Sequence, residues 1–147
     1  MSGSLYYQGK TFTVEWYCDA AGRMPAKAYY EDLPEEDQNR LDDIVAYMAD
    51  SPIGTRLPKT LYNEEDSKNK IYAFKPRDHR FFNFMTTGKK IVILNAYRKH
   101  SQQMTKKDLN LLETTVAAKN DYLRRVREGG SHGQRNAESK TGTSKSA

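Results

Sequence analysis

The stretch KIYAFKPRDHRFFNFMTTGKKIVILNAYRK, residues 70–99, decides the fold. It contains runs rich in β-branched and aromatic residues, which predict strands over residues 70–75, 79–85 and 90–99. Asp78 lies in the first connection between these runs, and the Thr87–Gly88 pair lies in the second. Connections this short join antiparallel neighbours, so the stretch predicts an antiparallel meander.

The chain before the meander predicts one strand and two helices. Residues 10–18 form the expected strand, and residues 26–32, which follow Pro25, form a short helix. A longer helix opens at Pro34 with acidic residues in its first turn, where the helix dipole favours negative charge. Its predicted apolar stripe follows the helical period and consists of Leu41, Ile44, Val45 and Met48.

The remaining segments are more polar. Residues 55–69 predict a loop with a short strand near Leu61, and we interpret the polar stretch 63–70 as an insertion. A last helix is expected to begin near Thr105, since Asp108 three residues later completes a capping box. It is expected to end at Gly129–Gly130, with an apolar stripe of Leu109, Leu112, Val116, Leu123 and Val126.

Helices and strands are segregated along the chain, which predicts an α+β fold. We expect two N-terminal helices and one C-terminal helix packed on a small, mainly antiparallel sheet. The length of 147 residues fits one domain. Its expected divisions are a flexible extension over 1–9, the folded domain over 10–128, and a disordered tail over 129–147, where large apolar residues are missing.

Composition excludes several classes of protein. The single Cys18 excludes an internal disulfide framework and a CxxC metal site. No apolar run approaches the roughly 18 residues of a membrane span, and no secretory signal is visible, so a cytoplasmic location is expected. The acidic clusters 35–37, 42–43 and 64–66 lack partnering histidines, so we expect neither a metal site nor a cofactor.

Charge is distributed unevenly along the chain. Residues 1–70 hold 8 Lys/Arg against 13 Asp/Glu, whereas residues 71–147 hold 16 Lys/Arg against 6 Asp/Glu. Within residues 71–107 the only acid is Asp78. A basic patch of this density attracts phosphates and favours a nucleic-acid partner over the alternative of a merely solvated surface.

Three short motifs resemble RelE/HigB-like toxins, in particular the phage-derived group. YEDLPEED at 30–37 resembles the family's junction between two helices, and IYAFK at 71–75 with HRFF at 79–82 resembles its strand–turn–strand motif. ILNAYRKHSQQMTKKDL at 93–109 resembles its strand end, basic turn and helix start. The resemblance covers roughly residues 10–127. Departures from the family pattern stand at Lys75, His100, Gln103 and Thr105.

The resemblance implies the toxin of a type II toxin–antitoxin pair. Such a toxin is a metal-independent endoribonuclease that cuts mRNA, usually on the ribosome, by attack of the ribose 2′-OH to give a 2′,3′-cyclic phosphate. Its partners are mRNA, the ribosome and a cognate antitoxin, often a helix-turn-helix repressor. The alternatives are a ParE-like inhibitor of DNA gyrase and a catalytically degenerate module that binds RNA or a partner.

Metal-free cleavage of RNA needs a proton acceptor, a proton donor and cations around the phosphate. The candidate catalytic residues are Arg80, Lys99, His100 and Lys75. Arg80 suits a bidentate grip on phosphate, and His100 titrates near neutral pH. Tyr72 and Tyr97 are interpreted as core residues rather than as platforms for bases. The candidate RNA-binding residues are Arg77, His79, Arg98, Lys106 and Lys107.

Overall fold

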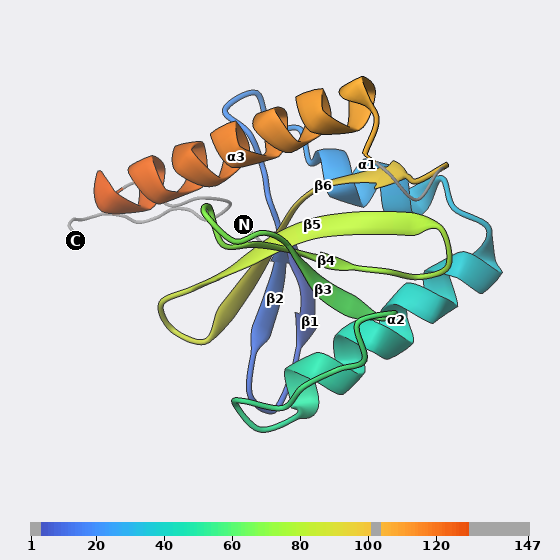
Figure 1. Ribbon diagram of the computed structural model, residues 1–147. Helices are drawn as coiled ribbons and strands as arrows, with labels where there is room; N and C mark the ends of the chain where they lie inside the picture. The colour runs from blue at the N-terminus through green and yellow to red at the C-terminus, as the bar shows by residue number, and fades with distance from the viewer. Residues whose placement is uncertain (1–3, 101–103, 130–147) are drawn as a thin grey trace.

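A mixed sheet forms the centre of the protein (Figure 1). The computed structural model describes residues 4–100 and 104–129. Within them, the strands are arranged in the order β1-β2-β6-β5-β4-β3, with β2 parallel to β6 and every other neighbouring pair antiparallel. The strands are β1 (Leu5–Gln8), β2 (Thr13–Trp16), β3 (Tyr62–Asp66), β4 (Ile71–Phe74), β5 (His79–Thr86) and β6 (Lys90–Arg98). The predicted α+β class and the meander of β4, β5 and β6 are confirmed.

The predicted extension over residues 1–9 is wrong where the structure describes it, because Leu5–Gln8 forms the edge strand β1. Tyr6 of this strand stacks on Trp16 with ring centroids 4.3 Å apart and donates a hydrogen bond of 2.6 Å to Asp42. The strand then turns at Gly9, where a Cβ would lie 2.5 Å from Ala49. Pairing with β2 and the contacts of Tyr6 with Trp16 and Asp42 therefore order this segment.

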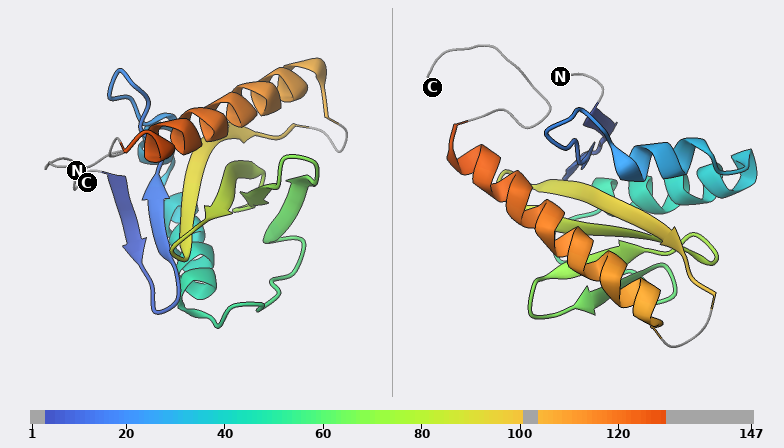
Figure 2. Two further views of the ribbon diagram at one scale, coloured as in Figure 1. Left: turned by 90° about the vertical axis from the view of Figure 1, so that its left-hand side faces the viewer. Right: turned by 90° about the horizontal axis from the view of Figure 1, so that it is seen from above.

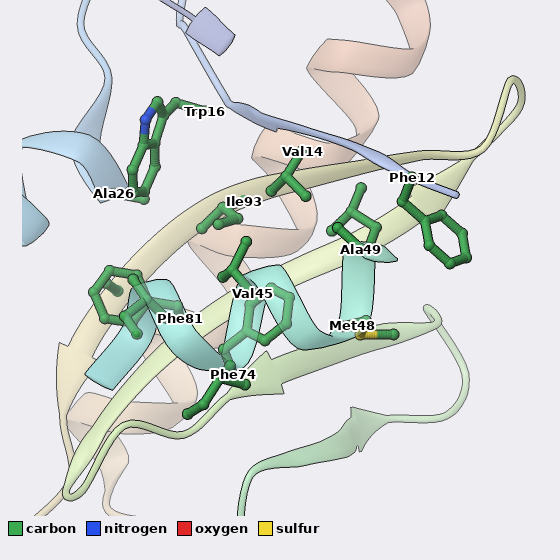
Figure 3. Packing of buried hydrophobic residues seen from close by; sticks show 14 residues of the cluster. Phe12, Val14, Trp16, Ala26, Val45, Met48, Ala49, Phe74, Phe81 and Ile93 are labelled. Carbon is green, nitrogen blue, oxygen red and sulfur yellow. The ribbon is translucent and has the colours of Figure 1, made fainter. Parts of the chain in front are cut away.

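One face of the sheet is covered by α1 (Pro25–Glu31) and α2 (Glu35–Asp50). The predicted stripe of α2 is confirmed, since Leu41, Ile44, Val45 and Met48 are all buried. Figure 3 shows this core, in which Val45 lies among Phe74 and Phe81 of the sheet. Burying a large apolar side chain of this kind contributes about 1.5–3 kcal/mol, so α2 is held mainly by this stripe.

The other face is covered by α3 (Lys106–Arg127), as Figure 1 shows. The predicted capping box is confirmed, because Thr105 accepts from the Asp108 backbone N–H and Asp108 accepts from the Thr105 N–H. The predicted stripe is partly wrong, since Leu109 and Val126 are 49% and 47% exposed. The face of α3 that packs on the sheet is rotated by about one residue from the predicted stripe. It includes Asp108, Leu111, Thr115 and Tyr122.

The segment interpreted as an insertion is part of the sheet. β3 pairs with β4 from Tyr62 to Asp66, with an irregularity in register between Glu64 and Asp66. The turn that follows is closed by Asp66, which accepts hydrogen bonds from the backbone and side chain of Asn69. The tail predicted for 129–147 lies outside the described residues from residue 130 onward.

Candidate active site

Strand register brings three predicted catalytic cations to one end of the sheet. Phe74 of β4 lies opposite Phe81 of β5. In this antiparallel register, Lys75, which follows Phe74, lies opposite Arg80, which precedes Phe81. Arg80 lies opposite Tyr97 of β6, and the Lys99 backbone N–H donates to the Asp78 carbonyl at 2.8 Å. The convergence expected from the family resemblance is thus present for Lys75, Arg80 and Lys99, which we name the cation cluster.

The cation cluster belongs to the α3 side of the sheet. Side chains alternate between the faces of a strand, and Phe82 and Tyr97 belong to the core beneath α3. Arg80 lies two positions before Phe82 and opposite Tyr97, so its side chain emerges on the same face. All three members of the cluster are half-buried.

Charge is crowded in the cluster. Burial lowers the pKa of Lys75, and the positive charges of Arg80 and Lys99 lower it further, while Glu65 opposes the shift. Lys75 Nζ donates to the Lys59 carbonyl at 3.0 Å, and Arg80 Nη1 donates to the carbonyls of Arg77 and His79, both at 2.9 Å. Among the described residues no carboxylate forms an ion pair with any of the three cations. Their charge is therefore available to an anion.

The predicted RNA-binding residues Arg77 and Arg98 are paired with acids. Arg77 lies in the left-handed region with φ of 60°, and its side chain binds both Glu36 and Asp37 at the start of α2. Arg98 Nε lies 2.8 Å from Asp78 Oδ2. Both arginines are exposed, so these ion pairs are weak, but an RNA phosphate would have to compete with them.

His79 does not fit its predicted role in RNA binding. The residue is 8% exposed, and its side chain lies on the face of α1 and α2. Nδ1 lies 2.7 Å from the Tyr29 hydroxyl, and Nε2 lies 3.1 Å from Asp37 Oδ2. Both ring nitrogens are thus occupied by groups of the fold, and His79 joins the start of β5 to the two N-terminal helices.

Two groups beside the cluster were not predicted as site residues, Glu65 and the Tyr97 hydroxyl. Glu65 was missed because residues 63–70 were interpreted as an insertion, whereas the Asn63 side chain donates to Glu65 at 3.4 Å within β3. Tyr97 is 8% exposed, as its interpretation as a core residue requires, yet its hydroxyl has no hydrogen-bond partner among the described residues. Burial raises the pKa of Tyr97 to about 12, and the charges of Asp108 and Glu65 add to the shift.

The other predicted residues lie around the start of α3. His100 is exposed and lines a cleft of about 730 Å³ between α1, the end of β6 and α3. Lys107 lines the same cleft, and Lys106 precedes it in the first, exposed turn of the helix. His100 and Lys107 therefore adjoin the cleft, and Lys99, which precedes His100 in the chain, belongs to the cation cluster.

No protein-family model matches the chain, and no curated protein matches it either. Across residues 4–100 and 104–129, no helix is long and apolar enough to cross a membrane. In the same ranges, no group of three or more His, Cys, Asp or Glu side chains is arranged to hold a metal ion.

Proposed function

We propose that this protein is a metal-independent endoribonuclease of the RelE/HigB type, acting as the toxin of a toxin–antitoxin pair. The observation that carries the proposal is the cation cluster, in which Lys75, Arg80 and Lys99 reach one face from three strands without carboxylate ion pairs among the described residues. Crowded cations are costly for a fold, and they stabilise the charge that grows on phosphorus during transfer.

Each group in the cluster suits one step of the reaction. The ribose 2′-oxygen attacks the adjacent phosphorus as Glu65 accepts its proton, and Arg80 and Lys99 hold the non-bridging oxygens. The bond from phosphorus to the 5′-oxygen breaks while the Lys75 ammonium donates a proton to that oxygen. The lowered pKa of Lys75 makes it a better proton donor than an ordinary lysine. The products are a 2′,3′-cyclic phosphate and a 5′-hydroxyl.

His100 is the second candidate for the proton acceptor. It is exposed at the strand end, next to Lys99, and its imidazole suits acid–base work near neutral pH. Comparing the cleavage rates of Glu65→Gln and His100→Ala shows which of the two residues is the proton acceptor. We expect the larger loss of cleavage from Glu65→Gln, because the Glu65 charge acts on both Lys75 and Tyr97 within the cluster.

The test is induction of the chain in a bacterial host, followed by growth measurement and primer-extension mapping of mRNA ends. Wild-type protein is expected to arrest growth and produce new 5′ ends within coding regions. The double variant Arg80→Ala/Lys99→Ala is expected to abolish both effects. Arg127→Ala, which removes an exposed cation at the far end of α3, is the matched control and should act like wild type.

Two outcomes overturn the proposal. Full toxicity of the Arg80→Ala/Lys99→Ala variant would remove the cation cluster from the activity. Growth arrest with intact mRNA and broken DNA would instead favour the gyrase-inhibiting branch of this fold. Expression together with the neighbouring gene tests the antitoxin partner, since a cognate antitoxin should restore growth.

A further inference from the structure

Arg80 is held by the backbone of the turn that precedes it. Its Nη1 donates to the carbonyls of Arg77 and His79, at 2.9 Å in both cases, and these two bonds use both hydrogens of Nη1. No described residue accepts a hydrogen bond from Nε or Nη2, so this edge of the guanidinium is left to grip a phosphate with two parallel bonds. The positions of the two carbonyls therefore determine where the phosphate-binding edge of Arg80 points.

Asp37 of α2 binds the same turn from the other face of the sheet. Asp37 Oδ1 lies 3.3 Å from Arg77 Nε, and Oδ2 lies 3.1 Å from His79 Nε2. The right-hand view of Figure 2 shows α2 and α3 on opposite sides of the sheet, and Arg80 emerges on the side of α3. Asp37 thus binds the side chains of the two residues whose carbonyls bind Arg80.

The contact between Asp37 and His79 is directional and shielded from water. A carboxylate only accepts hydrogen bonds, so we assign the ring hydrogen to His79 Nε2, and Nδ1 accepts from the Tyr29 hydroxyl at 2.7 Å. Burial raises the pKa of Tyr29, which keeps this hydroxyl a donor. The side chains of His79 and Asp37 are only 10% and 15% exposed, so salt screens their interaction less than it screens the exposed ion pairs nearby.

The backbone at Arg77 indicates that the turn depends on this support. The His79 N–H donates to the Pro76 carbonyl at 3.1 Å and closes the turn, and Arg77 within it has a φ of 60°. This left-handed conformation is costly for a residue with a Cβ and persists only where the surrounding structure imposes it. Glu36 and Asp37 bind the Arg77 side chain in that conformation, so removing the charge of Asp37 should let the turn relax.

We propose that Asp37 is a positioning residue for Arg80 and acts on it across the sheet through Arg77 and His79. The inference rests on the proposed function, because Arg80 belongs to the cation cluster. Asp37 lies on the face of α1 and α2, so it does not contact the RNA. It orders the turn whose carbonyls hold Nη1, and it thereby orients Nε and Nη2 toward the phosphate.

A double-mutant cycle separates positioning of Arg80 from a general effect on the fold. Asn has the shape of Asp but a single acceptor oxygen, so Asp37→Asn keeps at most one of the two contacts. We expect Asp37→Asn to lower kcat/KM for a short RNA about tenfold, because a catalytic group is displaced. In the Arg80→Ala background the same substitution should cost less than about twofold, since the guanidinium is gone. Asp43→Asn, at an exposed acid of the same helix, is the matched control and should have no effect in either background.

Tyr29→Phe is a milder variant that also tests the case in which Asp37→Asn does not fold. It removes only the hydroxyl that donates to His79 Nδ1. We expect it to lower kcat/KM about threefold, the effect of one hydrogen bond, and again only where Arg80 is present. Circular dichroism and urea unfolding show which variants are folded.

NMR spectroscopy of protein labelled with ¹⁵N-arginine tests the hold on Arg80 without any reaction. Two hydrogen bonds to Nη1 hinder its rotation and slow the exchange of its hydrogens with water. We therefore expect a distinct, slowly exchanging Nη1 signal of Arg80 in the wild type and in Asp43→Asn. Asp37→Asn should speed this exchange roughly tenfold, because the turn opens more often.

The outcomes for the inference and for the proposed function are distinct. Equal losses of kcat/KM from Asp37→Asn with and without Arg80 overturn the inference, as does an Arg80 signal that Asp37→Asn leaves unchanged. Cleavage that depends on Arg80 but not on Asp37 also overturns it and leaves the proposed function standing. A wild type that cuts no RNA overturns the proposed function, and the NMR signal then still decides whether Asp37 holds the guanidinium of Arg80.

Discussion

The two faces of the sheet differ in how they hold Lys, Arg and His side chains, although these side chains come from the same short stretch of chain. On the face of α1 and α2, Arg77 and His79 are bound to Glu36 and Asp37. On the face of α3, Lys75, Arg80 and Lys99 have no ion pair with a described carboxylate. The alternation of side chains along β5 separates a set that holds the fold from a set available to a ligand, as His79 and Arg80 illustrate.

The largest expected effect is on RNA cleavage by variants that differ only in the face they alter. Arg80→Ala should lower the cleavage rate roughly 100- to 1,000-fold, the usual cost of removing a donor that stabilises charge in the transition state. Arg98→Ala, which removes an exposed guanidinium paired with Asp78, should cost less than about threefold. Rates with a short RNA and purified protein measure both. Equal losses would contradict the distinction between the faces.

The free energy of unfolding should depend more on the face of α1 and α2 than on the face of α3, the reverse of the order expected for cleavage. His79→Ala removes the imidazole that joins Tyr29 to Asp37, so both lose a buried or half-buried partner. We expect a loss of about 1–3 kcal/mol in the free energy of unfolding, measured with urea. Lys99→Ala, on the other face, should change it by less than about 0.5 kcal/mol. A destabilising Lys99→Ala with a neutral His79→Ala would reverse the assignment.

The pH dependence of cleavage reports on Lys75. As the proton donor, Lys75 must carry its proton, so the cleavage rate should fall as pH rises through the pKa of Lys75. Because this pKa is lowered, the fall should come at a lower pH than for an ordinary lysine. Glu65 raises the pKa of Lys75, so Glu65→Gln should move this decline to still lower pH. The readout is the position of the decline rather than the overall rate, which also falls. A decline that stays in place or moves to higher pH would exclude Lys75 as the donor.

The smallest expected effect concerns two tyrosine hydroxyls. Tyr97→Phe removes a buried hydroxyl without a described partner, so the free energy of unfolding should stay the same or rise by up to about 1 kcal/mol. Tyr62→Phe is the matched control, because its hydroxyl donates to Asn83 at 2.8 Å, and its loss should cost about 1 kcal/mol. A costly Tyr97→Phe substitution would show that the hydroxyl is satisfied in the fold.

The sequence predicts the features that depend on local pattern. The meander, the stripe of α2 and the capping box of α3 follow from turn residues and apolar period, and all are confirmed. β1 was missed, and β3 was predicted only as a short strand near Leu61. β1 is ordered by the contacts of Tyr6 with Trp16 and Asp42, and the polar strand β3 is ordered by its pairing with β4. The predicted buried face of α3 differs from the observed one by about one residue. The prediction counted only apolar residues, whereas Thr115 and Tyr122, which carry hydroxyls, are buried against the sheet.

The candidate site, like the fold, was predictable from the sequence only in part. Motif resemblance placed Lys75, Arg80 and Lys99 together, and the register agrees with that placement. The burial of His79 was not visible, because its partners Tyr29 and Asp37 lie 50 and 42 residues away in the chain. Glu65 and the unpartnered Tyr97 hydroxyl were equally hidden, since each depends on how strands lie against one another.

Mass spectrometry of the ends of a cleaved RNA tests the central claim most directly. Purified protein is incubated with a short single-stranded RNA in the presence of EDTA, or with programmed ribosomes in the Mg²⁺ that ribosomes themselves require. The account predicts a 2′,3′-cyclic phosphate on the upstream fragment and a 5′-hydroxyl on the downstream one, both lost in Arg80→Ala/Lys99→Ala. Fragments ending in a 3′-hydroxyl and a 5′-phosphate, or cleavage of the free RNA that needs a divalent ion, would contradict it.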